Sequence, residues 1–449
     1  MSDKPSSAQA GEFDYKTLSL TVLSQILNQH ERLMSRRPGG RRALLSNHRI
    51  ESGDFSARDL READFTGAML AHSLFRRSQL QFANFFAADL RGSAFDGANL
   101  SRSDLRGACF RGASLVGATM TEADIREAVL TRYGASRIPM VVSRLEGHTD
   151  MSSINAQGAN LSQAKIGGSF VLRADFSNAN LTGADLRNAD LRLSNFNNAI
   201  LAGVNLSGVK AAGASFRGAV MTNVQVLDAD LGNADFTGAI IDPHLLTTPA
   251  FADAVLPQTP ESSGLDLDAC IEDHRLWLET GTSKGKRLAL DEMDLSKQHF
   301  DGMGLTAASF VSAILRNCNF IEAVLVTADL SRADLRMAVL RNADMRGVTL
   351  RGAHLNEAIL VGANLGPLQD VGSTGRQVPS NLESAHLIGA DLRNVRFTAA
   401  NMRKADLSRA QLEGADFRNC DLRGARFTGA QAGAANFEGA NLTDAIGLT

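Results

Sequence analysis

The stretch "ADFSNANLTGADLRNADLRLSNF", residues 174–196, contains two periods at once. An alanine followed by aspartate or asparagine returns every five residues, as at Ala174 and Ala179, whereas phenylalanine returns only after twenty, at Phe176 and Phe196. A period of five fits neither the 3.6 residues of a helical turn nor the two-residue alternation of a strand. The chain must therefore turn after each short extended piece.

Each five-residue unit, or pentad, places two residues inward, a small one and, two positions later, a Leu, Phe, Ile or Met. Gly and Asn near the end of the pentad tolerate turn conformations, and Asp and Asn can bond nearby backbone amides. If four pentads make one coil, residues twenty apart stack above one another. Three phenylalanine columns are then predicted: Phe55, Phe75, Phe95; Phe176, Phe196, Phe216, Phe236; and Phe397, Phe417, Phe437.

Dozens of pentads follow this A-(D/N)-L-x-x pattern in register, and the sequence therefore resembles the pentapeptide-repeat family. The resemblance implies an all-β fold, a right-handed quadrilateral parallel β-helix, to which we add short helical cap and linker segments. The periodicity indicates parallel strands between neighbouring coils. The right-handedness comes from the resemblance alone.

Composition narrows the class of protein. The 449 residues include 22 Phe but one Trp and two Tyr, a restricted vocabulary typical of repeats. Four distant cysteines form no CxxC pair and indicate reduced thiols. Cys318 and Cys420 occupy the small inward position, whereas Cys109 is expected to point outward, where it could be modified.

We expect a cytoplasmic, bacterial protein. The opening "MSDKPSSAQAGEF" is polar, with no apolar run behind it, and no stretch approaches the roughly 18 apolar residues of a membrane span. A formal charge of −3 gives no electrostatic hint of a partner.

Breaks in the pentad register divide the chain. Solenoid blocks alternate with a tail and helical cap, an interruption, a linker and a loop. In order, the segments are 1–44 (tail and amphipathic capping helix), 45–130 (solenoid), 131–158 (interruption), 159–242 (solenoid), 243–287 (linker with a helix), 288–365 (solenoid), 366–384 (loop) and 385–449 (solenoid).

Two of these segments resemble each other. "ILNQHERLMSRRPGGRRALL" from residue 26 and "CIEDHRLWLETGTSKGKRLAL" from residue 270 both read as a short helix, then glycine and basic residues, then a repeat. His30 matches His274, and Leu33 and Met34 match Leu276 and Trp277 within a residue. We therefore predict that 243–287 is related to 22–44, and that the protein duplicates one unit of helical lead-in, long solenoid, loop and second solenoid.

The sequence offers little for catalysis. His30 and His274 are the candidates because they recur at matching points, but the favoured interpretation is a histidine at the edge of a helix packing face. His48, His72, His354 and His386 lie at different phases and form no metal-ligand pattern. No phosphate loop, nucleotide fingerprint or zinc spacing is present. We expect a protein that is not an enzyme, without cofactor or metal.

Outward residues remain as candidates for partner binding. "RADLRMAVLRNADMRGVTLR" places four arginines at one phase of successive pentads, hence one on each side of a single coil. A solvated ring, partly offset by Asp334 and Asp344, is the favoured interpretation, and docking of an acidic partner is the alternative. The candidate partner-binding residues are His30, His274, Trp277, Arg336, Arg341, Arg346 and Arg351.

Three functions are considered. A rigid cytoplasmic scaffold for protein-protein interactions needs only the rod and its varied outward residues. The family resemblance adds a DNA mimic that binds and protects topoisomerase (gyrase), which needs a continuous acidic surface, whereas 46 basic and 49 acidic residues nearly balance here. A secreted effector is the third. We expect the scaffold, with an unidentified protein partner, no membrane, and no nucleic acid.

The final stretch, "NLTDAIGLT", shows no capping helix, so a homodimer through the C-terminal coil is a further expectation.

Overall fold

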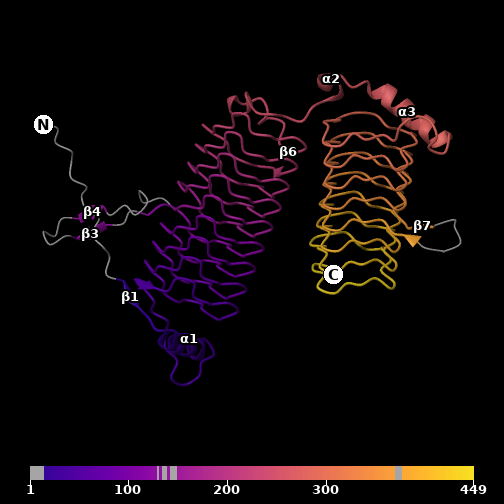
Figure 1. The fold of residues 1–449 in the computed structure, drawn as a ribbon. Coiled ribbons are helices and arrows are strands. Elements are labelled where there is room, and N and C mark those ends of the chain that lie inside the picture. The colour runs from indigo at the N-terminus through magenta and orange to yellow at the C-terminus, as the bar shows by residue number, and fades with distance from the viewer. Residues whose placement is uncertain (1–14, 129–130, 134–138, 142–148, 370–376, 449) are drawn as a thin grey trace, which may run out of the picture. The chain divides into compact units, whose positions relative to one another are not determined.

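The computed structural model describes residues 15–128, 131–133, 139–141, 149–369 and 377–448 (Figure 1). Contacts divide the chain into two compact units, each with its own stack of coils. Unit 1 comprises residues 1–235 and 241–254, and unit 2 comprises residues 236–240 and 255–449.

Both stacks are held by parallel bridges between residues twenty apart. Within unit 1, Asp175 pairs with Asn195 and Asn180 with Ile200, and unit 2 repeats the pattern, as in the pair of Asp329 and Thr349. Each pentad contributes one such bridge, because the chain turns before a longer strand can form. The twenty-residue coil expected from the phenylalanine spacing is confirmed, and the fold is a β-solenoid.

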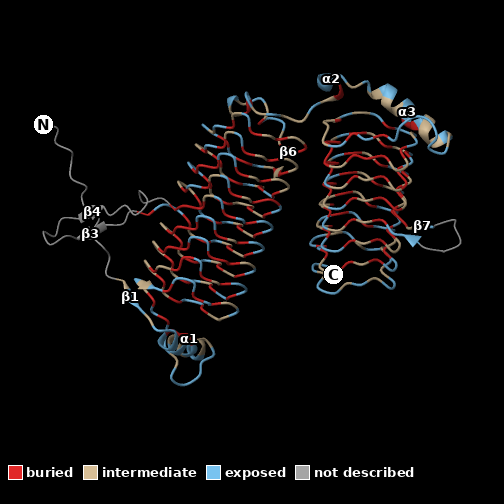
Figure 2. Ribbon diagram, viewed as in Figure 1, coloured by how far each residue is buried: buried red, intermediate tan, exposed pale blue. Residues whose placement is uncertain are grey.

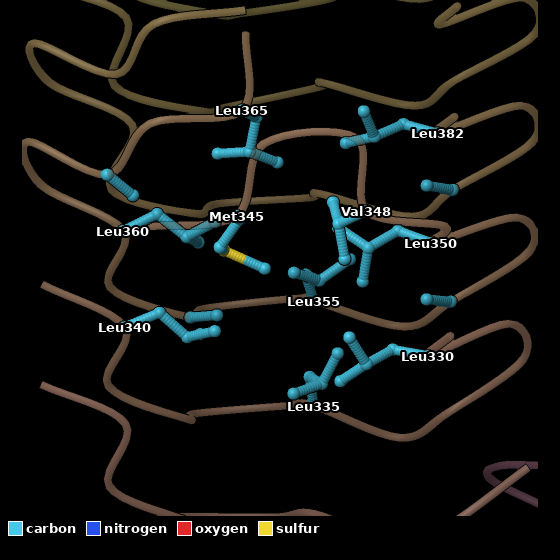
Figure 3. Packing of buried hydrophobic residues seen from close by; sticks show 14 of the residues in the cluster. Leu330, Leu335, Leu340, Met345, Val348, Leu350, Leu355, Leu360, Leu365 and Leu382 are labelled. Carbon is cyan, nitrogen blue, oxygen red and sulfur yellow. The ribbon is translucent and has the colours of Figure 1, made fainter. Parts of the chain in front are cut away.

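The core lies inside the coils, where the small and large inward residues alternate along the chain (Figure 2). Ala179 and Leu181 are 0% exposed. In unit 2 the side chains of Leu335 and Leu355 lie in successive coils and point into the same interior (Figure 3). Since every coil adds the same inward set, the core continues from coil to coil.

The predicted phenylalanine columns exist. Ring centroids lie 5.1 Å apart for Phe176 and Phe196 and 5.0 Å apart for Phe196 and Phe216, with nearly parallel planes. The other two columns stack in the same way, at 4.6 to 4.9 Å. Unit 1 also holds a further column that was not predicted from the sequence: Phe65 stacks on Phe85 and meets Phe55 edge-on at 5.6 Å.

Corners are built as the composition predicts. The outward Asp or Asn accepts a hydrogen bond from the backbone N–H two residues on, as Asp175 Oδ1 does from Ser177 at 2.9 Å. Two residues after the large inward residue the backbone is left-handed, at Gly183 (φ 66°) and Asn188 (φ 58°). Gly and Asn favour this conformation, which explains their place in the pentad.

Helices and short strands lie before, between and beside the coils. Unit 1 begins with β1 (Lys16–Thr17), which pairs in parallel with β2 (His48–Arg49), and with helix α1 (Leu20–Met34), capped by the Ser19 side chain. The remaining elements are β3 (Thr131–Tyr133) antiparallel to β4 (Pro139–Val141), β5 (Val220–Met221) beside β6 (Ile240–Ile241), the 3-10 helix η1 (Pro249–Phe251), α2 (Pro260–Ser263), α3 (Leu267–Glu279), and β7 (Leu368–Gln369) antiparallel to β8 (Gln377–Val378). Among the described helices, none has the length and apolarity needed to cross a bilayer.

Two expected boundaries require correction. The coil resumes at Asp150, which bridges to Cys109, so the interruption assigned to 131–158 is too long. It was hidden because Ile154 fills the small inward position and Ala156 the large one, the reverse of the usual order. Likewise the loop assigned to 366–384 ends earlier, since Asn381 already bridges to Thr349. Residues 370–376 of that loop lie outside the described part.

The cysteines follow the expectation with one exception. Cys318 and Cys420 are buried in the small inward position, and their thiols donate to the carbonyl oxygens of Leu295 (2.9 Å) and Phe397 (3.1 Å). Cys109, expected to point outward and be open to modification, is only 5% exposed. It lies on a coil wall beside Asp89 and Asp150, and burial, together with these carboxylates, raises the pKa of its thiol. The reactive thiolate is therefore disfavoured.

Candidate functional site

Unit 1 opens with a helix that places His30 against the first coil. Helix α1 buries Leu23, Leu27 and His30, and the Nδ1 atom of His30 accepts a hydrogen bond from the backbone N–H of Ala43 at 3.1 Å. A second contact runs from the N–H of Arg41 to the carbonyl of Gln29, at 3.0 Å. The helix thus supplies acceptors to backbone groups that have no preceding coil to bond.

Unit 2 opens in the same way. Helix α3 buries His274, whose Nδ1 accepts from the N–H of Leu288 at 3.1 Å, and the N–H of Lys286 donates to the carbonyl of Asp273 at 3.2 Å. The residues on either side match in order: Gln29 with Asp273, His30 with His274, Arg41 with Lys286. We call each of these arrangements a histidine cap, defined by His30 and Ala43 in unit 1 and by His274 and Leu288 in unit 2.

The shared glycine before the basic residues has a steric reason. A Cβ atom on Gly40 would lie 2.4 Å from the backbone nitrogen of Leu33. One on Gly285, which has φ of 71°, would lie 2.1 Å from the carbonyl oxygen of Asp273. Only glycine lets the returning chain run this close to the helix.

Electrostatics keep both imidazoles neutral. Burial lowers the pKa of His30 and of His274, partly offset by the backbone carbonyls of Arg61 and Thr306 respectively. A histidine that accepts at Nδ1 carries its proton on Nε2. In both caps Nε2 is buried, and the described residues offer it no hydrogen bond within normal geometry. Among the described residues, no nucleophile or carboxylate is bonded to either ring, so the geometry assigns both histidines to capping.

Trp277 belongs to the same cap in unit 2. Its ring stacks on His274 with centroids 5.5 Å apart and planes 16° from parallel, and its side chain is half-buried. It therefore covers the imidazole from one side.

The arginine ring lies on four successive walls of one coil in unit 2, as the pentad phase predicts. Arg336 forms an ion pair with Asp334 (2.8 Å), Arg346 with Asp344 (2.7 Å), and Arg351 lies 3.7 Å from Glu383. Arg341 has no ion pair among the residues described. The ring is thus largely compensated, and the four arginines do not converge on one point.

This compensation is general on both units. Where an outward Asp is followed two residues later by Arg, the guanidinium bonds both carboxylate oxygens, as Arg187 does with Asp185 at 2.9 and 2.7 Å. Further pairs of this kind are Asp59–Arg61, Asp89–Arg91, Asp104–Arg106, Asp124–Arg126, Asp190–Arg192, Asp391–Arg393, Asp416–Arg418 and Asp421–Arg423.

The structure also brings together two histidines that the sequence reading set aside. His354 and His386 stack on neighbouring coils with centroids 4.5 Å apart. Burial and the neighbouring His386 lower the pKa of His354 to about 3, so the stack is neutral. Across the described residues no three ligands are placed to hold a metal ion. The expectation that these histidines lie at different phases is wrong for this pair: each follows a small inward residue directly, and the loop between the two pentads concealed the match.

A cavity of about 320 Å³ opens on unit 1 around Cys109. Its other lining residues are Met69, Ala87, Ala88, Asp89, Arg91, Gly107 and Arg111. Arg91 is held by Asp89 and Arg111 by Asp150, and the pKa of the thiol is raised. No group in the cavity is therefore prepared to act as a base or nucleophile.

Comparison with known proteins agrees with this architecture. The model of pentapeptide repeats matches residues 59–132, 157–238, 305–366 and 380–444 in overlapping segments, and the chain belongs to this family. No curated protein matches the chain.

Solved structures similar to the chain include three pentapeptide-repeat proteins. Full-length QnrB1, a plasmid-mediated fluoroquinolone resistance protein, is 24% identical over 35% of this chain and 76% of its own, with a TM-score of 0.32. HetL, involved in heterocyst differentiation regulation in the cyanobacterium Nostoc sp. strain PCC 7120, is 20% identical over 88% and 87%, with a TM-score of 0.15. Rfr23 from the cyanobacterium Cyanothece 51142 is 22% identical over 32% and 90%, with a TM-score of 0.19.

Proposed function

We propose that this protein is a non-enzymatic scaffold that binds protein partners on the outward faces of its coils, in the cytoplasm. One observation carries the proposal. His30 and His274, which occupy matching points of the two units, are engaged in capping, so these recurrent polar groups serve the fold, whereas the outward residues differ from pentad to pentad. A surface that varies over a constant core suits recognition rather than turnover.

The finer architecture is part of the proposal. Four bridges per coil support a quadrilateral cross-section, and membership of the family supports the right-handed coil. The matching histidine caps support a duplication in which 243–287 corresponds to 22–44. An experimental structure with left-handed or three-sided coils would contradict this description.

Native affinity capture with chemical cross-linking tests the scaffold. The intact chain serves as bait, and another solenoid of the same family serves as the control for non-specific adhesion. We expect partners that cross-link to outward residues of the coils and are absent from the control. Capture that equals the control at every position would argue against a scaffold.

A topoisomerase partner is less well supported, even though QnrB1 is a fluoroquinolone resistance protein. A DNA mimic needs a continuous negative surface, because its target is built to attract phosphates. Here many outward carboxylates are neutralised by an arginine two residues later, as in Asp104 with Arg106 and Asp190 with Arg192. Inhibition of gyrase supercoiling by the purified chain would reverse this preference.

The last coil of unit 2 supports the proposal of a homodimer. Its inward residues, including Phe437 and Leu442, are only partly buried, whereas Phe417 and Leu422 one coil earlier are 0% exposed. A second copy packed on this coil would bury them. We expect sedimentation to show a dimer that Phe437→Asp dissociates, and a wild-type chain that remains monomeric at high concentration would exclude this interface.

A further inference from the structure

One wall of unit 2 carries outward aliphatic side chains in the middle of its height. The bridges of this wall align His299, Asn319, Val339, Ile359 and Asp391 in one column. Each of these residues is followed, two positions later, by a second outward residue on the same wall. Ile321, Arg341 and Val361 form that second column, so that Arg341 lies between two aliphatic neighbours.

The aliphatic surface extends over both corners of the wall. Met337, at the corner before Val339, is 54% exposed, and Val324, beyond the other corner, is 37% exposed. The wall residues between them are half-buried, as side chains standing on a sheet are. We call Ile321, Val324, Met337, Val339, Ile359 and Val361 the aliphatic strip.

Arg341 lacks the carboxylate that holds many arginines of this protein. Several arginines at the same phase are bonded by the Asp two residues earlier, as Arg393 is by Asp391 and Arg346 by Asp344. Two residues before Arg341 stands Val339, which has no carboxylate. Within the described part of the chain, the guanidinium of Arg341 has neither an ion pair nor a side-chain hydrogen bond.

Neighbouring charges leave this arginine available. Glu322 and Glu357 stand at the two corners, exposed, and neither forms an ion pair with it in the described residues. The guanidinium of Arg393, bonded to both oxygens of Asp391, and more weakly that of Arg341, two coils away on the same wall, lower the pKa of this carboxyl. At the other end of the wall His299 lies 3.4 Å from Asp301. The strip therefore presents one cation that forms no ion pair among the described residues, surrounded by aliphatic groups.

We propose that the aliphatic strip docks a segment of another protein that carries aliphatic side chains and one Asp or Glu, with the carboxylate bonded to Arg341. A carboxylate binds a guanidinium through two parallel hydrogen bonds, and aliphatic surroundings exclude water from that pair. Nucleic acid is a poorer fit, because its affinity depends on several phosphate contacts and the strip offers one cation. This inference rests on the proposed scaffold function and names the chemistry of its partner.

Selection from a library of short random peptides displayed on phage tests the proposal on the full chain. We expect enriched peptides with at least two aliphatic residues and one Asp or Glu. Their affinity should fall roughly tenfold or more with Arg341→Ala, since removing the cation strands a desolvated carboxylate. The matched control is Arg346→Ala, at the same pentad phase of the same coil, whose guanidinium is already bonded by Asp344. It should leave the affinity unchanged.

Charge reversal makes the test specific. Selection on Arg341→Glu should replace the acidic residue of the consensus with Lys or Arg while the aliphatic residues stay. Val339→Asp should abolish the binding of both sets of peptides, those selected on wild type and those selected on Arg341→Glu. These side chains point outward, and circular dichroism should show an unchanged melting temperature.

Other outcomes would overturn the proposal for the aliphatic strip, and they can be distinguished from failure of the proposed scaffold function. Peptides that bind with equal affinity to wild type and Arg341→Ala would place binding elsewhere, leaving the scaffold intact without the strip. Light scattering that shows a dimer dissociated by Val339→Asp would make the strip a contact between two copies. An absence of enriched peptides, with no cross-linked partner in native capture, would remove both proposals.

Discussion

At the scale of the residue, the corner of the pentad requires a left-handed backbone but tolerates side chains other than glycine. Two residues after most of the large inward residues the backbone is left-handed, yet Phe82, Leu193 and Met337 stand there with φ of 61°, 59° and 60°. A left-handed residue other than glycine costs roughly 1–2 kcal/mol. These side chains therefore hold a conformation that glycine would adopt without that cost.

Leu193→Gly should relieve that strain. Its side chain is 54% exposed, so little packing is lost, and glycine adopts the left-handed conformation freely, although it gains more freedom in the unfolded chain. We expect a gain of about 0.5 kcal/mol in the free energy of unfolding, measured by urea denaturation. Leu193→Ala, which keeps a Cβ, is the control and should gain nothing.

Phe196→Ala addresses the core. The ring is fully buried between Phe176 and Phe216, so truncation should cost roughly 3–5 kcal/mol. Repeats depend on their neighbours, so amide exchange should rise around Phe176 and Phe216 as well. Exchange that rises only at residue 196 would show that the stacked rings do not couple adjacent coils.

Residue spacing predicted the core because the pentad alternation and the twenty-residue column are written in the sequence. Cys109 was mispredicted because burial on a wall depends on the residues that bridge to it from the coils on either side. These residues are Asp89, twenty positions earlier, and Asp150, which the interruption concealed. Likewise Ile154 and Ala156 exchange the usual sizes, which conceals a pentad from a pattern of size alone.

At the scale of the element, the histidine cap explains how each solenoid starts. The sequence matched His30 with His274 but could not assign their role, because the acceptor geometry at Nδ1 depends on a chain return thirteen or fourteen residues later. His30→Ala would leave the buried N–H of Ala43 without a partner and should cost about 1–3 kcal/mol or more.

His30→Asn provides the matched variant, because its side-chain oxygen can replace Nδ1 as acceptor. We expect it to recover most of the stability lost in His30→Ala, judged by the urea midpoint and by amide exchange at Ala43. Equal losses in both variants would mean that the ring fills space and that its hydrogen bond contributes nothing.

Acid should weaken the same cap. Burial holds the folded-state pKa of His30 below its ordinary value of 6.5, so the unfolded chain binds the proton more readily. Stability is then independent of this group above pH 6.5 and falls as pH drops below it, by at most about 1.4 kcal/mol per pH unit. Urea unfolding of unit 1 between pH 7.5 and 5.5 should show this slope in wild type. A His30→Asn variant with the same slope would assign it to other groups.

At the scale of the whole molecule, the two units have separate starts and separate cores. One continuous buried cluster runs from Leu288 to Phe427 within unit 2, beneath its own histidine cap. We predict two calorimetric transitions, because cooperativity in a solenoid passes only between neighbouring coils. His274→Ala should lower one transition temperature and leave the other unchanged. A single transition that shifts as a whole would show that the units unfold together.

The coil keeps its pitch across the two insertions that lie within the units. Bridges elsewhere join residues twenty apart, yet Cys109 pairs with Asp150 and Thr349 with Asn381, across the two insertions, and the columns continue on both sides. A corner therefore accepts extra chain of different lengths without disturbing the stack, at an entropic cost that grows slowly with length. Such corners are suitable sites for grafting: a foreign recognition loop inserted between two coils would be held at a position along the solenoid that is set by the number of coils before it.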